Sequence, residues 1–86
     1  MSLGRQGENT MDYRNASYIE MSTGDGRDRS VVELGSQVWL PATKTYIDVV
    51  GLMAKAETGV LHYMITSTDY GQYEFTHGGY YFVMWS

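Results

Sequence analysis

The residues of this 86-residue chain that could exchange protons near neutral pH are two histidines, His62 and His77. Catalysis by a serine or threonine needs a histidine that accepts its proton and a third group that orients the histidine. Neither histidine lies in a local motif of that kind, such as a nucleophile elbow. We therefore predict no catalytic residues. The enzyme hypothesis that remains is a small oligomer whose site is shared between subunits, in a cleft that includes His62 and Tyr46.

Metal and cofactor sites are also not expected. The chain has no cysteine, which excludes disulfide bonds and thiolate zinc sites. The run Asp25–Asp28 lacks the oxygen spacing and the closing glutamate of a calcium loop. Glycines occur in pairs, but no strand, glycine loop and helix with a lysine follow one another as in a phosphate-binding loop. We predict no metal and no cofactor.

The charge distribution disfavours nucleic acid as a partner of the domain body. The formal net charge is −4, and from Val31 onward the only cations are Lys44 and Lys55. Phosphate binding and stacking on single strands both need clustered basic residues, so we expect Trp39 and Tyr63 to pack in the core instead. There is no apolar run of about 18 residues and no charged-then-apolar leader. We expect a cytoplasmic protein with no membrane partner.

Length and hydrophobic pattern predict one small β-rich domain. Residues 1–12 have little hydrophobic content, so we expect a flexible leader followed by a single domain over 13–86. A domain of this size buries only about 60–65% of its unfolded surface, and self-association is the support that remains when disulfides and metals are excluded. The expected strands are Tyr18–Met21, Val31–Leu40 with a glycine break, Thr45–Leu52, Val60–Thr66, Gln72–His77 and Tyr80–Trp85.

Residues 43–57 carry signals for two structures. Tyr46, Val49 and Met53 sit at helical spacing, and residues 53–57 are good helix formers. Residues 45–50 are instead dense in β-branched and aromatic side chains. We favour a strand over 45–52 with a turn over 54–59, and keep a short helix near 43–57 as the alternative. The fold class is therefore all-β or β-rich α+β, with four or five antiparallel strands from Val31 to Trp85.

The C-terminal residues predict a hairpin with an aromatic face. Gly78 and Gly79 supply the positive φ values of a two-residue type I′ loop, which would place Phe75 opposite Phe82. Strand alternation then assigns one set of side chains to the core: Tyr73, Phe75, His77, Tyr80, Phe82 and Met84. The other set is displayed, and we expect it to form a binding surface: Tyr81, Val83, Trp85, Glu74 and Gln72. The alternative is that another segment of the same fold covers this second face.

The segment Leu34–Pro41, followed by Val49–Leu52 and Leu61–Ile65, resembles the opening of an SH3-like small barrel. The resemblance covers about residues 33–86 as a pattern of short β-segments, and it implies a fold class but no activity. One family with this barrel, the plasmid-borne type II dihydrofolate reductases, forms an enzyme only as a tetramer around a central pore. Its Val-Gln-Ile-Tyr active-site stretch is absent here, so the resemblance implies no such activity.

The function that the sequence favours is a non-catalytic binding or assembly module that self-associates or docks a protein partner through the aromatic face. A second hypothesis is an acidic inhibitor from a phage or mobile element, whose carboxylates would occupy a basic channel. That hypothesis depends on where Asp48, Glu57, Asp69 and Glu74 lie on the folded surface. The enzyme with a shared site is the third.

Overall fold

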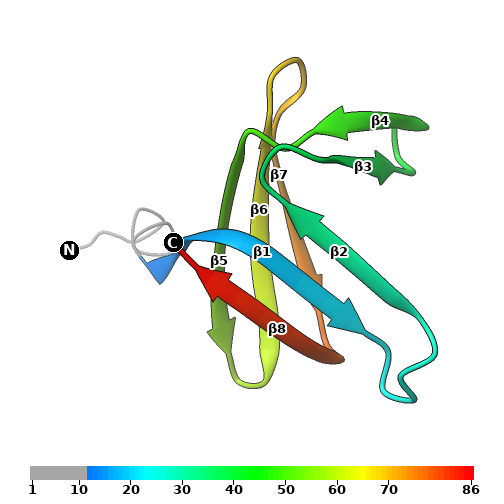
Figure 1. Ribbon diagram of the computed structural model, residues 1–86, viewed down its shortest axis with the longest axis vertical. Coiled ribbons are helices and arrows are strands. Elements are labelled where there is room, and N and C mark those ends of the chain that lie inside the picture. The colour runs from blue at the N-terminus through cyan, green and yellow to red at the C-terminus, as the bar shows by residue number, and fades with distance from the viewer. Residues whose placement is uncertain (1–11) are drawn as a thin grey trace.

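The computed structural model describes residues 12–86, and the regular elements in this range are all antiparallel β-strands. The all-β class is confirmed. The helix considered near 43–57 does not form, because two strands occupy those residues. The expected leader lies outside the described residues apart from Asp12. In chain order (Figure 1) the strands are β1 (Arg14–Ser22), β2 (Arg29–Glu33), β3 (Gln37–Leu40), β4 (Thr45–Asp48), β5 (Gly51–Glu57), β6 (Val60–Ser67), β7 (Gly71–His77) and β8 (Tyr80–Trp85).

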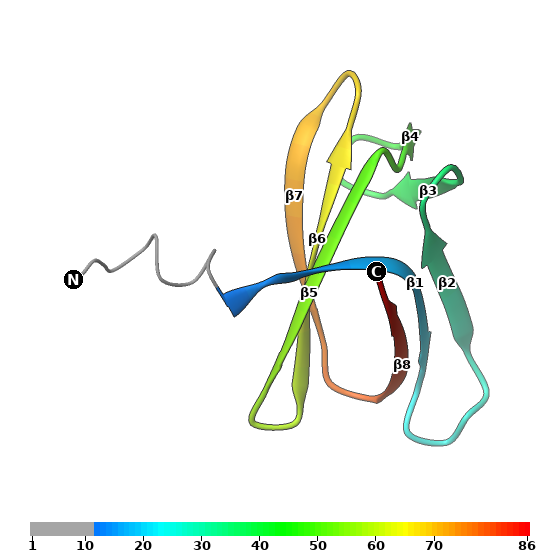
Figure 2. The ribbon, with the colours of Figure 1, turned by 60° about the vertical axis from the view of Figure 1, so that its left-hand side comes forward.

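The first strand, β1, organises the sheet because three other strands pair with it. Its first residues, Arg14 and Asn15, pair with β5, and its later residues pair with β2 on one edge and β8 on the other. The path β2-β1-β5-β6-β7 is continuous, while β3 and β4 form a separate hairpin. The register of β1 against β8 shifts between Ala16 and Tyr18, and a bulge of this kind bends a strand. The sheet therefore curls into a half-barrel, with β5 to β7 across from β2 and β8 (Figure 2).

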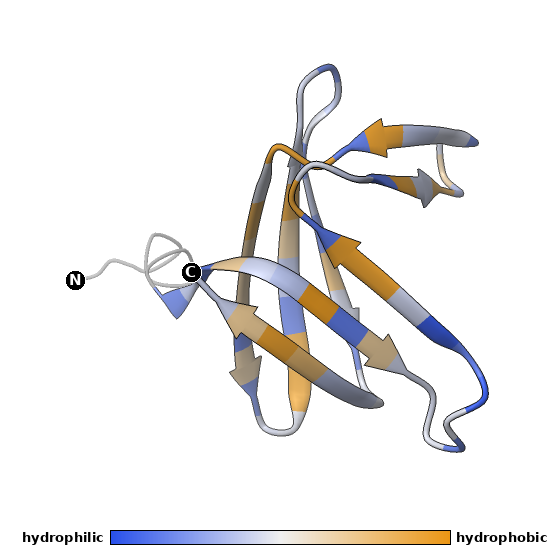
Figure 3. Cartoon of the chain, viewed as in Figure 1, coloured by the Kyte–Doolittle hydropathy of each residue, from blue (hydrophilic) through white to orange (hydrophobic). Residues whose placement is uncertain are grey.

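The core fills the concave side of the half-barrel. Apolar and polar residues alternate along β1, so that one face of the strand is buried (Figure 3). Ile19, Leu61 and Ile65 are almost fully buried there, and the β3–β4 hairpin adds Ile47. Burying a side chain of this type stabilises the fold by about 1.5–3 kcal/mol. The core thus joins residues from both ends of the chain.

The turn expected over 54–59 is shorter than predicted. Strand β5 continues to Glu57, which pairs with Val60 of β6. The loop between them is Thr58-Gly59, and both residues have positive φ, 51° and 80°. Two central residues with positive φ define a type I′ hairpin. The tight reversal that the sequence predicts at Gly78-Gly79 therefore occurs here instead.

The predicted C-terminal hairpin is wrong in its pairing. Strands β7 and β8 exist, but β7 pairs with β6 and β8 pairs with β1. Neither Gly78 nor Gly79 has a positive φ. The His77 Nε2 atom lies 3.1 Å from the carbonyl oxygen of Ser22 and 3.0 Å from that of Tyr80, so an Nε2–H donates to both. This segment is a corner at which the chain crosses to the other side of the half-barrel.

Gly79 is required at the corner by a close backbone approach. A Cβ on Gly79 would lie under 3.0 Å from the Ser22 carbonyl oxygen, whereas a Cβ on Gly78 would meet no atom within 4 Å. We predict that Gly79→Ala lowers the free energy of unfolding by about 1–3 kcal/mol through overpacking. Gly78→Ala is the matched control and should be neutral or slightly stabilising. Urea unfolding measures both, and equal effects of the two substitutions would contradict this account of the corner.

Candidate functional site

The exposed face of β8 is the reverse of the one that the hairpin predicts. Tyr81 and Val83, expected on display, are half-buried and pack against the core. Tyr80, Phe82 and Met84, expected in the core, are 67%, 57% and 51% exposed. The reason is the changed partner, because the register of β8 is set by β1 and not by a two-residue loop after β7. The face assignment of β7 is correct, since Tyr73 and Phe75 pack on the core.

Tyr18 of β1 extends this exposed surface, which we call the β8 outer face and define as Tyr18, Tyr80, Phe82 and Met84. Met84 lies opposite Tyr18 in the register, and the rings of Tyr18 and Phe82 meet edge-on with centroids 6.5 Å apart. Glu20, opposite Phe82, forms an ion pair with Arg29 and accepts a hydrogen bond from the Tyr18 hydroxyl at 3.1 Å. Its charge is thus compensated by neighbours, and the surface presents aromatic and thioether groups.

The outer edge of β8 is open along its length in residues 12–86, because β1 is the strand that pairs with it. Natural proteins protect open edges with charges, short strands or bulges. Strand β2 carries Arg29 and Glu33, β7 carries Glu74, and β3 and β4 have four residues each. Strand β8 reads Tyr-Tyr-Phe-Val-Met-Trp, with no charge, proline or glycine. It combines an unprotected edge with an exposed apolar face.

Gln72 and Glu74, the polar part of the predicted binding surface, lie apart from the β8 outer face. Both are exposed on β7, which is not adjacent to β8 in the sheet. Glu74 accepts a hydrogen bond from the hydroxyl of Tyr13. Trp85, the fifth predicted residue, is partly exposed, and the Arg14 guanidinium lies 4.7 Å from its ring centroid. The structure therefore separates the β7 residues from the β8 residues of that set.

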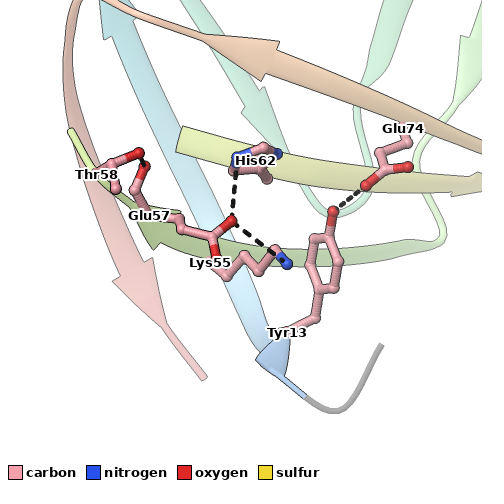
Figure 4. A network of polar contacts seen from close by, with 6 residues as sticks. All are labelled: Tyr13, Lys55, Glu57, Thr58, His62 and Glu74. Carbon is pink, nitrogen blue, oxygen red and sulfur yellow. Dashed lines mark hydrogen bonds and ion pairs between the residues drawn. The ribbon is translucent and has the colours of Figure 1, made fainter. Parts of the chain in front are cut away.

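A polar network that the sequence did not reveal crosses β5, β6 and β7 (Figure 4). The Lys55 Nζ atom lies 5.2 Å from the ring centroid of Tyr13 and 3.9 Å from Glu57 Oε1. The His62 Nε2 atom lies 3.8 Å from the same carboxylate oxygen. Burial raises the pKa of Tyr13, and the hydrogen bond and negative charge of Glu74 add to the effect. Tyr13 therefore keeps its proton and ties the start of β1 to β7, which is a structural role.

Within the single chain, His62 and Tyr46 lie in different parts of the fold. His62 lies on β6 beside Glu57, whereas Tyr46 lies on the β3–β4 hairpin. The Tyr46 ring meets Trp39 edge-on at 5.2 Å, and both rings are more than half exposed, so the core position expected for Trp39 is wrong.

An apolar groove of about 350 Å³ opens between β2, β3 and the β6–β7 pair. Tyr63 and Phe75 stack along one wall with ring centroids 5.2 Å apart, and Val32, Val38 and Trp39 line the other side. Burial raises the pKa of the Tyr63 hydroxyl, which stays neutral at physiological pH. The groove exposes the edge of the core, and among the residues of 12–86 that line it only Tyr63 carries an ionisable group.

Comparison with known proteins gives no relative for this chain. No protein-family description, no curated protein and no solved structure matches it. Within residues 12–86 no three histidine or carboxylate side chains gather closely enough to hold a metal ion. The same range contains no helix that is long and apolar enough to cross a membrane.

The Tyr13–Glu74 hydrogen bond should stabilise the fold in a pH-dependent way. Because the pKa of Tyr13 is higher in the folded chain, its contribution is complete below pH about 10 and is lost as the pH rises through the folded value. We predict that Tyr13→Phe costs about 1 kcal/mol at pH 7 and that the difference from wild type shrinks above pH 10. Urea unfolding from pH 7 to 11 tests this, with Tyr46→Phe as the exposed control. A difference that stays constant to pH 11 would count against the proposed role of Tyr13.

Proposed function

We propose that this chain is a non-catalytic assembly module that associates with itself through the β8 outer face. The observation that carries the proposal is the uncharged strand β8, which exposes Tyr80, Phe82 and Met84 beside an open edge in residues 12–86. Monomeric proteins seldom leave such a combination uncovered, because it promotes contact with other chains. We also propose, from the resemblance in sequence, that this half-barrel is related to the SH3-like small barrels. Such a relationship concerns the fold and implies no activity.

The small core gives a thermodynamic reason for association. A chain of 86 residues without cysteine has neither disulfides nor a large interior to stabilise it. Tyr and Phe are enriched at protein interfaces, and a tyrosine can bury its ring while its hydroxyl stays in water. Covering the β8 outer face would remove apolar surface from water at about 25 cal/mol per Å². Association would therefore also stabilise the fold.

The acidic-inhibitor alternative gains no support from charge placement. The Thr68 hydroxyl donates a hydrogen bond to the Asp48 carboxylate and the Thr68 N–H donates a second at 2.9 Å, and both bonds lower the pKa of this carboxyl. Glu57 forms an ion pair with Lys55, and Glu74 accepts a hydrogen bond from the Tyr13 hydroxyl. Asp69 lies in the turn after β6, at the opposite end of that strand from the Glu57 turn. Glu57 and Glu74 belong to the network around Tyr13, whereas Asp48 lies beside Thr68, the residue before Asp69. The four carboxylates are thus divided between two regions and partly engaged in local contacts, and inhibition stays a prediction without a specific observation behind it.

We predict concentration-dependent self-association that depends on Phe82. Sedimentation equilibrium of the full chain should show a mass above that of the monomer, and Phe82→Ser should raise the apparent dissociation constant at least tenfold. Tyr46→Ser is the matched control, because Tyr46 is 60% exposed and Phe82 57%, but Tyr46 lies on the β3–β4 hairpin. The control should leave association unchanged.

Two results would overturn the proposal. One is a wild-type chain that stays monomeric up to millimolar concentration. The other is equal weakening of association by Phe82→Ser and Tyr46→Ser, which would place the contact elsewhere or make it unspecific. Circular dichroism of each variant shows that a loss of association does not come from unfolding.

A further inference from the structure

The backbone of β8 presents alternate residues to its open edge. The Ser86 N–H donates to the Asn15 carbonyl at 3.0 Å, and the Ser17 hydroxyl donates to the Met84 carbonyl at 3.3 Å. Met84 and Ser86 therefore direct their backbone groups toward β1. Because neighbouring residues of a strand direct these groups to opposite edges, the N–H and C=O groups of Tyr81, Val83 and Trp85 point outward. No strand in residues 12–86 pairs with them.

These three residues are symmetric about Val83, which determines how a second copy could pair. We propose that β8 pairs antiparallel with β8 of a second copy, about a two-fold axis at Val83. Tyr81 then lies opposite Trp85 of the other copy, and Val83 lies opposite itself. Every outward N–H and C=O of β8 gains a partner in this register. An axis at Phe82 or Tyr81 would place Trp85 beyond the end of β8 of the other copy.

The side chains are compatible with this pairing on both faces. A two-fold axis perpendicular to the sheet keeps the core side of both copies on the same face. On the exposed face Phe82 lies opposite Met84 of the second copy, a favourable contact between sulfur and an aromatic ring. On the core face Tyr81 lies opposite Trp85 and would cover the part of that ring that is exposed in the single chain.

The absence of charge on β8 favours a second copy as the occupant of this edge. Strand β8 carries no charge, so pairing with itself opposes no like charges, although the chain as a whole is acidic. The exposed parts of Tyr80, Phe82, Met84 and Trp85 amount to on the order of 400 Å² per copy, against the ~800 Å² per partner of a standard stable interface. The pairing therefore corresponds to a modest dimer. Because the two-fold axis uses the same edge of both copies, the assembly closes at two chains.

This inference rests on the proposed function and specifies its partner and contact, so its test must separate pairing along the edge from packing of the outer faces. Amide hydrogen exchange of the wild-type chain, followed by NMR below and above the association midpoint, makes that distinction. The amides of Tyr81, Val83 and Trp85 should become at least tenfold more protected at high concentration. The amides of Phe82, Met84 and Ser86, which face β1, should be protected at both concentrations.

The outcomes separate the two proposals. If the chain associates but the amides of Tyr81, Val83 and Trp85 keep the same exchange rate, edge pairing is wrong and self-association through the outer face stands. If the chain does not associate and no amide depends on concentration, both proposals fail. Amides at the open edge of β7 serve as the internal control and should not respond to concentration.

Single-cysteine variants test the register, since the natural chain has no cysteine to interfere. An oxidised equimolar mixture of F82C and M84C should give a disulfide-linked dimer, because these residues are directly opposite in the proposed pairing. F82C alone and M84C alone should link several-fold less, because like residues are then offset along the strands. T76C, exposed on β7, is the control and should not link. Equal linking by F82C alone and by the mixture would overturn the register.

Discussion

The structure depends on the position of β1, which pairs with strands from both halves of the chain. Its first residues pair with β5 and its later residues with β2 and β8, and the bulge between Ala16 and Tyr18 allows one strand to serve both sides. Because β8 pairs with β1, it does not pair with β7, the strand that precedes it in the chain. Were β8 to pair with β7, the concave core would lose Tyr81 and Val83, which now pack against it.

Local patterns in the sequence predicted a β-rich class and most of the strands, but they did not predict the strand partners, and the strand expected over Thr45–Leu52 is divided between β4 and β5. Runs such as Val60–Thr66 are predicted as strands from their β propensity and largely apolar side chains, and those signals act within a few residues. Two adjacent glycines also predict a tight turn, yet Gly79 serves to avoid a clash with the Ser22 carbonyl, a residue far away in the sequence. The actual type I′ loop, Thr58-Gly59, has a β-branched residue at a positive φ, so the sequence favoured the wrong site.

The sequence predicted an aromatic contact surface on the last strand, but it did not predict which residues of that strand are exposed. That β8 has one buried and one exposed face follows from alternation, and an aromatic contact surface was expected there. Which set faces outward depends on the parity of pairing with β1, and that parity changes with a shift of one residue. The network around Tyr13 could not be predicted either, because it joins the first described residues to Glu74 through tertiary packing alone.

Strand β8 pairs with β1 and has no second strand partner in residues 12–86, and NMR of the dilute chain tests this pairing most directly. Val83 lies opposite Ile19 in the β1–β8 register, at a position where the two Hα atoms face each other between hydrogen-bonded pairs. A strong nuclear Overhauser effect between the Hα atoms of Ile19 and Val83 is the expected result. Cross-strand effects between Val83 and Glu74, the pair that a two-residue hairpin would bring together, would contradict the account.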